Sequence, residues 1–182
     1  MSKRIDGVHI AILTTEGFEE VELTQPLKAL REAGAQVSVV SPKGPTVRAW
    51  NQTDWSIEVP VDAELKDAAA DQFDALVLPG GVINPDKLRL IPAAVTFVKD
   101  FFAADKPVFA VCHGPQMLIE AEAVKGKTLT SWPSLKTDLV NAGATWVDKE
   151  VVVDGNLVTS RKPDDLPAFI AKAISMLETA KA

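Results

Sequence analysis

One stretch of the chain decides the fold: residues 108–121, which read VFAVCHGPQMLIEA. An apolar run stops at Cys112, and a helical pattern begins a few residues later. This order predicts a buried strand, a sharp turn and a helix. Ala110 and Gly114, on either side of the cysteine, are small, as a tight strand-to-helix turn requires. The stretch therefore predicts a turn that presents Cys112 at the end of a strand.

Cys112 is the only cysteine of the chain, and its predicted position favours chemistry. A thiol at this turn lies beside backbone N–H groups and the positive end of the following helix, and both favour the thiolate. The alternative is a cysteine that only packs in the core, because free cysteines are among the most buried residue types. The surrounding order of small residue, Cys, His, Gly and Pro favours a nucleophile.

Strand-like and helix-like segments alternate along the chain. Apolar runs at 8–13, 37–40, 75–78 and 108–111 predict buried strands, and helical spacing covers 18–33, 92–104 and the segment from Asp164 onward. Residues 45–62 and 151–159 suggest hairpins, the second around Asp154-Gly155. This alternation predicts an α/β fold with a mostly parallel sheet between two layers of helices. The length suits one domain over residues 1–182.

Three segments follow predicted strands and should meet at the carboxyl edge of the sheet, where such folds bind ligands. They are residues 14–19, Gly80-Gly81 and Cys112-His113. The N–H groups of Gly81 and His113 could stabilise an oxyanion, and the glycine pair would let a substrate approach the backbone. A plain loop is the alternative for the glycines, but the convergence of three segments favours a site.

Two side chains are candidates for moving protons at Cys112. His113 is adjacent, and imidazole titrates near neutral pH, although consecutive side chains at a strand end tend to point apart. Glu19 follows the first strand at the same edge, and a semi-buried, protonated carboxyl there could donate to the thiolate. The alternative for Glu19 is the solvated acidic start of a helix, and the residues alone leave both interpretations open.

Composition excludes several classes of function. The net charge is −6 without a cluster of Lys or Arg, which argues against nucleic-acid binding. One cysteine and two histidines lack the spacing of a zinc site. A single cysteine forms no internal disulfide, no apolar stretch is long enough for a bilayer, and the polar N-terminus is no signal peptide. We therefore expect a cytoplasmic protein.

Several blocks in order resemble the ThiJ/PfpI superfamily, in its branch of PfpI intracellular proteases and stress proteins. The main blocks are residues 17–23 (GFEEVEL), 74–81 (DALVLPGG) and 110–116 (AVCHGPQ), and further matches cover 131–134, 141–148 and 151–156. The resemblance runs over nearly the whole chain. It implies a flavodoxin-like, three-layer α/β/α sandwich similar to class I glutamine amidotransferases, with a nucleophile elbow.

The resemblance also implies roles for individual residues. Cys112 would be the nucleophile and Glu19 its protonated partner. Asp86 would orient His113 from a neighbouring subunit, so the site would require a homo-oligomer, either a dimer or a hexamer. No cofactor is implied.

The activities attributed to this family are varied: peptidase, cofactor-independent glyoxalase, deglycase and chaperone-like protection. We expect a cysteine-dependent, stress-protective enzyme that acts on small carbonyl or amide substrates through Cys112. The alternative is a redox-sensing or chaperone-like stress protein whose Cys112 is oxidised without turnover. A glutamine amidotransferase subunit is disfavoured, because no histidine follows His113 to supply the usual downstream pair.

Overall fold

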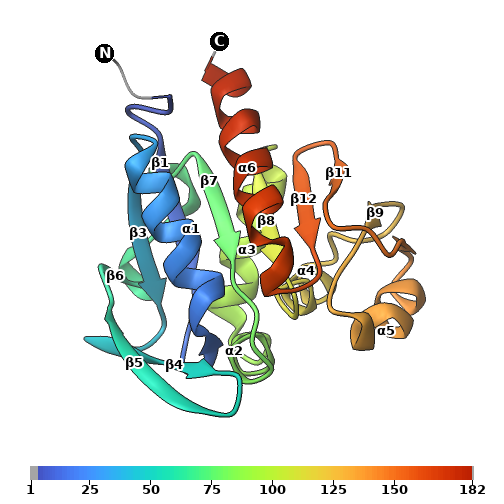
Figure 1. Cartoon of the computed structure of the whole chain (residues 1–182), viewed down its shortest axis with the longest axis horizontal. Helices are drawn as coiled ribbons and strands as arrows, with labels where there is room; N and C mark the ends of the chain where they lie inside the picture. Colours follow the sequence, from blue (N-terminus) through green and yellow to red (C-terminus); the bar gives the residue numbers. More distant parts are fainter. Residues whose placement is uncertain (1–3, 182) are drawn as a thin grey trace.

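A seven-stranded sheet lies between two layers of helices in the computed structural model, which describes residues 4–181 (Figure 1). The strand order is β11-β12-β8-β7-β1-β3-β6, and every neighbouring pair is parallel except β11 and β12. This confirms the predicted α/β class with a mostly parallel sheet. The polar start at residues 1–3 lies outside the described residues. The strands of this sheet are β1 (His9–Leu13), β3 (Gln36–Ser41), β6 (Ala63–Glu64), β7 (Ala75–Leu78), β8 (Val108–Val111), β11 (Val152–Asp154) and β12 (Leu157–Ser160).

Two small sheets and six α-helices complete the described fold. β2 (Phe18–Glu19), β4 (Thr46–Asn51) and β5 (Asp54–Pro60) form one small sheet, and β9 (Thr128–Leu129) pairs with β10 (Thr145–Trp146) in the other. The helices are α1 (Glu20–Glu32), α2 (Ile83–Leu88), α3 (Pro92–Ala103), α4 (Gln116–Glu120), α5 (Lys136–Asn141) and α6 (Leu166–Lys181). The 3₁₀ turns are η1 (Leu65–Asp67), η2 (Ala70–Gln72), η3 (Pro133–Leu135) and η4 (Pro163–Asp165).

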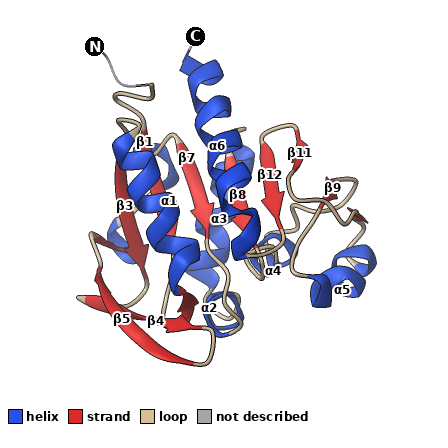
Figure 2. Ribbon diagram, in the orientation of Figure 1, coloured by secondary structure: helices blue, strands red, loops and turns tan. Residues whose placement is uncertain are grey.

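Each face of the large sheet has its own layer of helices, as Figure 2 shows. Phe109 and Val111 of β8 point into the cluster that contains residues of α1 and α6. Val108 and Ala110 point into the opposite cluster, with residues of α3 and α4. Because every residue of β8 is buried, the strand reads as a continuous apolar run rather than an alternating one.

The predicted helix over 18–33 begins later than expected. Phe18 and Glu19 pair with Ala49 and Trp50 as a short parallel strand, and α1 starts only at Glu20. The last helix differs in the same way, because residues 163–165 form a 3₁₀ turn before α6. The first difference matters for the site, since it decides which glutamate turns toward the sheet.

The parallel arrangement brings the loops after β1, β7, β8 and β12 to one edge of the sheet. Among the described residues, no helix combines the length and apolar character that crossing a bilayer would need. Within the same residues, no group of three or more His, Cys, Asp and Glu side chains is placed to hold a metal ion.

Candidate active site

Cys112 occupies a strained turn directly after β8. Its φ is 61°, in the left-handed region that non-glycine residues enter at a cost of about 1–2 kcal/mol. Two backbone hydrogen bonds hold it: its N–H donates to Ser160 O at 3.0 Å, and its carbonyl accepts from Trp132 N at 2.9 Å. A Cβ on Gly114 would lie 2.4 Å from Leu78 O, so the turn has no room for a side chain there. The predicted nucleophile elbow is therefore present.

Cys112 is only 7% exposed as a residue, yet it lies at a cavity of about 710 Å³. The cavity opens at the carboxyl edge of the sheet, where the sequence placed the site. Its described lining includes Glu19, Glu22, Trp50, His113, Trp132 and Lys162.

Glu22, rather than Glu19, is the carboxyl group that meets the thiol. It lies in the first turn of α1, is fully buried, and accepts a hydrogen bond from Gly80 N at 2.8 Å. Burial raises the pKa of Glu22 to about 8, and hydrogen bonds with Cys112 and Gly80 offset this only in part. The carboxyl is therefore mainly protonated at neutral pH and carries little charge beside the sulfur.

Glu19 stands at the outer part of the cavity, and its expected contact with Cys112 is not found. Its Oε1 accepts from Gln52 N at 3.3 Å, at the turn between β4 and β5. Glu19 belongs to β2, so the helix that follows aims Glu22 inward instead. The sequence held a signal for this: Glu22, Pro26 and Leu30 fall at helical spacing on the buried face of α1. An acid within an apolar stripe marks a buried carboxyl.

His113 reaches the thiol despite being its sequence neighbour. Its Nδ1 lies 3.3 Å from Cys112 Sγ, and its ring stacks on Trp132 with centroids 6.0 Å apart and planes at 23°. Burial lowers the pKa of His113. The imidazole is therefore neutral at physiological pH and able to accept a proton from the sulfur.

The surroundings of Cys112 do not lower its pKa as the sequence predicted. Burial raises the pKa of the thiol most, and a charge on Glu22 raises it further. The N–H groups of Gly81 and His113 lower it, but the short helix that follows does not outweigh burial. Because Glu22 and Cys112 each disfavour a charge on the other, their titrations are coupled. The Nδ1 of His113, at 3.3 Å, is close enough to take the thiol proton.

The glycine loop after β7 supplies backbone N–H groups to both Glu22 and Cys112. The Gly80 N–H donates to Glu22, so it faces the carboxyl rather than open space for an oxyanion. A Cβ on Gly80 would lie 2.5 Å from Glu22 Oε2 and 2.7 Å from Cys112 Cβ, so only glycine fits. Gly81, at φ 81°, directs its N–H to the sulfur.

Asp86 lies on α2 with its side chain exposed. Among the described residues of this single chain, no hydrogen bond or ion pair joins it to His113. A role for Asp86 from a neighbouring copy stays a prediction.

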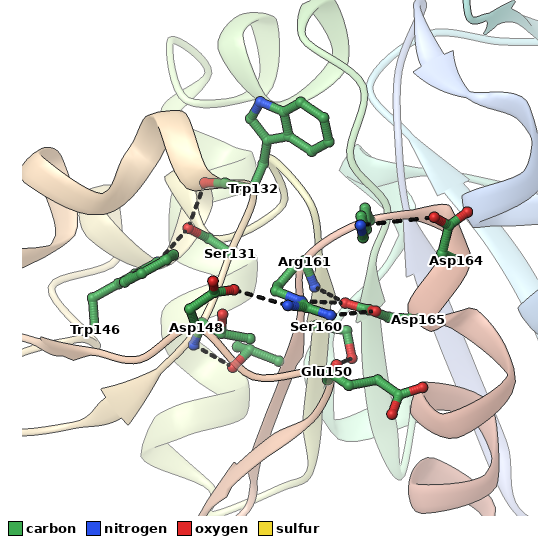
Figure 3. Close-up of polar contacts among 12 residues, drawn as sticks. Ser131, Trp132, Trp146, Asp148, Glu150, Ser160, Arg161, Asp164 and Asp165 are labelled. Carbon is green, nitrogen blue, oxygen red and sulfur yellow. Dashed lines mark hydrogen bonds and ion pairs between the residues drawn. The ribbon is translucent and has the colours of Figure 1, made fainter.

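A network of hydrogen bonds holds the segment that carries the cavity residue Trp132 (Figure 3). Trp146 Nε1 donates to Ser131 Oγ at 3.0 Å, and this hydroxyl donates to the carbonyl of Trp132 at 2.8 Å. These bonds fix the segment whose N–H holds the carbonyl of Cys112.

Arg161 anchors the opposite side, next to the cavity residue Lys162. Its guanidinium donates to the buried Asp165 through Nε and Nη2, both at 3.0 Å, and to Asp148 through Nη1 at 2.8 Å (Figure 3). The two parallel hydrogen bonds from the guanidinium to Asp165 fix the orientation of the Arg161 side chain as well as its distance from the carboxylate. The sequence suggested Asp165 only as an acidic residue in the first turn of the last helix. Its pairing with Arg161 was missed, because this pairing depends on how the chain turns after β12.

This arrangement of thiol, imidazole and buried carboxyl coincides with a match along the chain. The sequence profile of the DJ-1/PfpI family covers residues 8–176. The chain belongs to the DJ-1/PfpI family. It is 48% identical to general stress protein 18 of Bacillus subtilis, over 94% of this chain and 99% of that one. It is 44% identical to protein/nucleic acid deglycase 2 of Escherichia coli, over 97% and 99% of the two chains.

A solved member of the DJ-1/PfpI family has the same fold. The crystal structure of Drosophila melanogaster DJ-1beta superposes with a TM-score of 0.86 at 32% identity, covering 98% of this chain and 91% of that one. The expected membership of the superfamily and the expected flavodoxin-like fold are both confirmed.

Proposed function

We propose that this chain is a cysteine-dependent enzyme of the deglycase or glyoxalase type, acting on small carbonyl compounds and their adducts with amines. The observation that carries the proposal is the thiol of Cys112 at a 710 Å³ cavity, 3.3 Å from a neutral imidazole and in contact with a buried carboxyl. The name of the E. coli relative, protein/nucleic acid deglycase 2, supports it.

The chemistry starts with addition of the sulfur to a carbonyl carbon. The S–C bond forms as the C=O π bond opens, and the thiol proton passes to His113 Nδ1 and on to the new alkoxide. The backbone N–H groups of Gly81 and His113 donate hydrogen bonds to the sulfur and stabilise its negative charge when the proton leaves. For methylglyoxal, a base then moves the proton on C1 of the hemithioacetal to C2, which gives a thioester of lactate, and water breaks its S–C bond to release lactate and the thiol. Where the substrate is a hemiaminal, the C1–N bond breaks and the amine leaves with a proton as the S–C bond forms, which gives the same hemithioacetal.

Glu22 keeps this sequence of steps free of a competing negative charge. A carboxyl that is protonated near neutral pH hydrogen-bonds to the sulfur without repelling it. At a pH well above 8 the carboxylate would repel the thiolate, so the pair loses its second proton with difficulty.

Cavity size supports small substrates over long peptides. A volume of about 710 Å³ falls in the range that encloses a small molecule. Peptidase-type hydrolysis would use the same thiol and imidazole, and the experiment below separates the two substrate classes.

The test measures turnover of methylglyoxal, of its adduct with N-acetyl-lysine, and of a fluorogenic peptide by the wild type and by Cys112→Ala. We expect turnover of the first two and no activity in the variant. Activity retained by Cys112→Ala would overturn the role of the thiol. Stoichiometric oxidation by hydrogen peroxide, seen by intact mass, without turnover of any carbonyl would favour the redox-sensing alternative instead.

We also propose that the active form is a homo-oligomer in which Asp86 of one copy orients His113 of another. In support, Asp86 is exposed on α2 between Val82 and Leu90, apolar residues that are 66% and 80% exposed. Light scattering should give a dimer or hexamer. Mixing inactive Asp86→Ala with inactive Cys112→Ala chains should restore part of the activity, because a mixed assembly contains one intact site. No recovery after subunit exchange would contradict the contribution in trans.

A further inference from the structure

Asn84 is a buried amide that joins two loops beneath the site. It lies in the first turn of α2 and is 0% exposed. Its Oδ1 accepts from Thr15 N at 2.8 Å and from Thr14 Oγ1 at 3.2 Å, in the loop after β1. Its Nδ2 donates to the carbonyls of Pro79 and Gly80 at 3.1 and 3.3 Å. With two donors and two acceptor positions in use, this amide has no capacity left for a substrate.

The first clamped carbonyl controls the N–H that faces Glu22. Pro79 O and Gly80 N belong to one trans peptide unit, in which C=O and N–H point in opposite directions. When Asn84 holds the carbonyl on one side, the N–H must point to the other. There it donates to Glu22 Oε2 at 2.8 Å.

The second clamped carbonyl controls the N–H that faces the sulfur. Gly80 O and Gly81 N share the next peptide unit, also trans. The bond from Asn84 to this carbonyl turns the Gly81 N–H toward Cys112, where it favours the thiolate. One side chain thus fixes two consecutive peptide planes.

Besides close packing, few other hydrogen bonds fix the two carbonyl groups. Gly80 and Gly81 carry no side chains, and glycine has the widest choice of φ and ψ. The other hydrogen bond to Gly80 O comes from Glu19 N at 3.4 Å, the longer of the two contacts.

We infer that Asn84 is a positioning residue that aims the Gly80 N–H at Glu22 and the Gly81 N–H at Cys112. For turnover, the inference rests on the proposed function. For the reactivity of the thiol it stands alone, because alkylation by iodoacetamide needs no substrate or product.

The experiment compares Asn84→Asp with the wild type. The aspartate has the same shape and keeps both acceptor bonds to the loop after β1, but it replaces the two donors with oxygen that repels the carbonyls. The rate of iodoacetamide alkylation is measured against pH. We expect the midpoint of the profile to move up by about one unit, which is about tenfold slower alkylation below the midpoint, because a hydrogen bond to a charged group is lost.

Leu139→Ala serves as the control for loss of stability alone. Leu139 is fully buried in α5, away from the glycine loop, so this variant should unfold more easily and keep the wild-type alkylation profile. An Asn84→Asp protein that is folded and has the wild-type profile would overturn the inference and leave Asn84 a purely structural residue.

A measurement on the wild type covers the case in which Asn84→Asp does not fold. The amide ¹⁵N and ¹H shifts of Gly80 and Gly81 are followed by NMR through the same pH range. Both should move with the midpoint of alkylation, and shifts that stay constant through it would reject the inference. If the shifts and the alkylation profile behave as expected while no carbonyl is turned over, the proposed function fails and the role of Asn84 stands.

Discussion

The cavity has two walls that differ in how they are built. The inner wall contains Cys112, Glu22 and Gly81, which are all buried. Hydrogen bonds with backbone groups at the edge of the large sheet hold Cys112 and Glu22 in place. The outer wall consists of Trp50, Trp132 and Lys162, which come from the β4–β5 hairpin and from loops and remain partly exposed. Under the proposed function, we expect this difference to place the chemistry on the inner wall and substrate recognition on the outer one. Substitutions on the inner wall should therefore act on rate and pH dependence, and those on the outer wall on substrate affinity.

Replacing the nucleophile gives the largest effect. Cys112→Ser keeps the size of the side chain but removes the polarisable sulfur, and we expect kcat to fall roughly 10³-fold or more with little change in KM. Steady-state kinetics with methylglyoxal check this, and Thr159→Ser, a mild change on the neighbouring strand β12, is the control. A fall in affinity without loss of kcat would erase the distinction between the walls.

Glu22→Gln tests the inner wall through the pH dependence of the free energy of unfolding. The pKa of Glu22 is about 8 in the folded protein and about 4.5 when unfolded. A raised pKa means that the folded state prefers the proton, so the stability present below pH 4.5 is lost as the pH rises toward 8. Between pH 5 and 7 this loss is roughly 2–3 kcal/mol. Glutamine cannot ionise and should remove it.

The measurement is urea unfolding of both proteins at several pH values, with Glu19→Gln as the matched control. Glu19 is only half-buried, and its carboxylate keeps a bond from Gln52 N, so its replacement should change the pH dependence much less. Equal slopes for Glu22→Gln and the wild type would mean that the buried carboxyl is not the titrating group.

The two walls also differ in how far the sequence could predict them. The apolar runs gave the sheet, and the small residues around Cys112 gave the elbow, because these are local patterns. Glu22 was missed because the short strand β2, which depends on pairing with a distant hairpin, delays the start of α1. Asn84 left no pattern at all, since its role arises only when the loops after β1 and β7 meet. The thiol pKa was misjudged because burial depends on the complete fold.

Trp132→Leu tests the outer wall at one of its two tryptophans. Trp132 is 38% exposed and its ring stacks on His113, so leucine removes both an aromatic surface and a support for the imidazole. We expect KM to rise about fivefold to tenfold and kcat to change less, because the substrate loses an aromatic contact worth about 1 kcal/mol of binding free energy. Trp132→Phe should retain most of the affinity. Trp55→Leu is the control, because Trp55 is equally exposed at 37% and does not line the cavity. The same rise in KM for Trp55→Leu would remove the special role of Trp132.

The smallest effect is expected at Lys162, the one Lys or Arg among the described residues that line the cavity. Its ammonium lies 3.7 Å from Asp164, and both side chains are well exposed, so solvent weakens the pair. The net charge of −6 repels anions in general, and Lys162 locally offsets this for a substrate that carries a carboxylate. Lys162→Met should raise KM for glyoxylate about threefold and leave KM for the neutral methylglyoxal unchanged.

High salt provides the second arm of this test, because screening should abolish the threefold difference for glyoxylate in the wild type as well. Lys172→Met, a change at an exposed position of α6 outside the cavity, should affect neither substrate. An equal rise in KM for glyoxylate and methylglyoxal would assign Lys162 to the shape of the rim rather than to its charge. The outer wall would then select substrates by their shape alone. It would differ from the inner wall in its exposure to solvent, but its charge would play no part in selection.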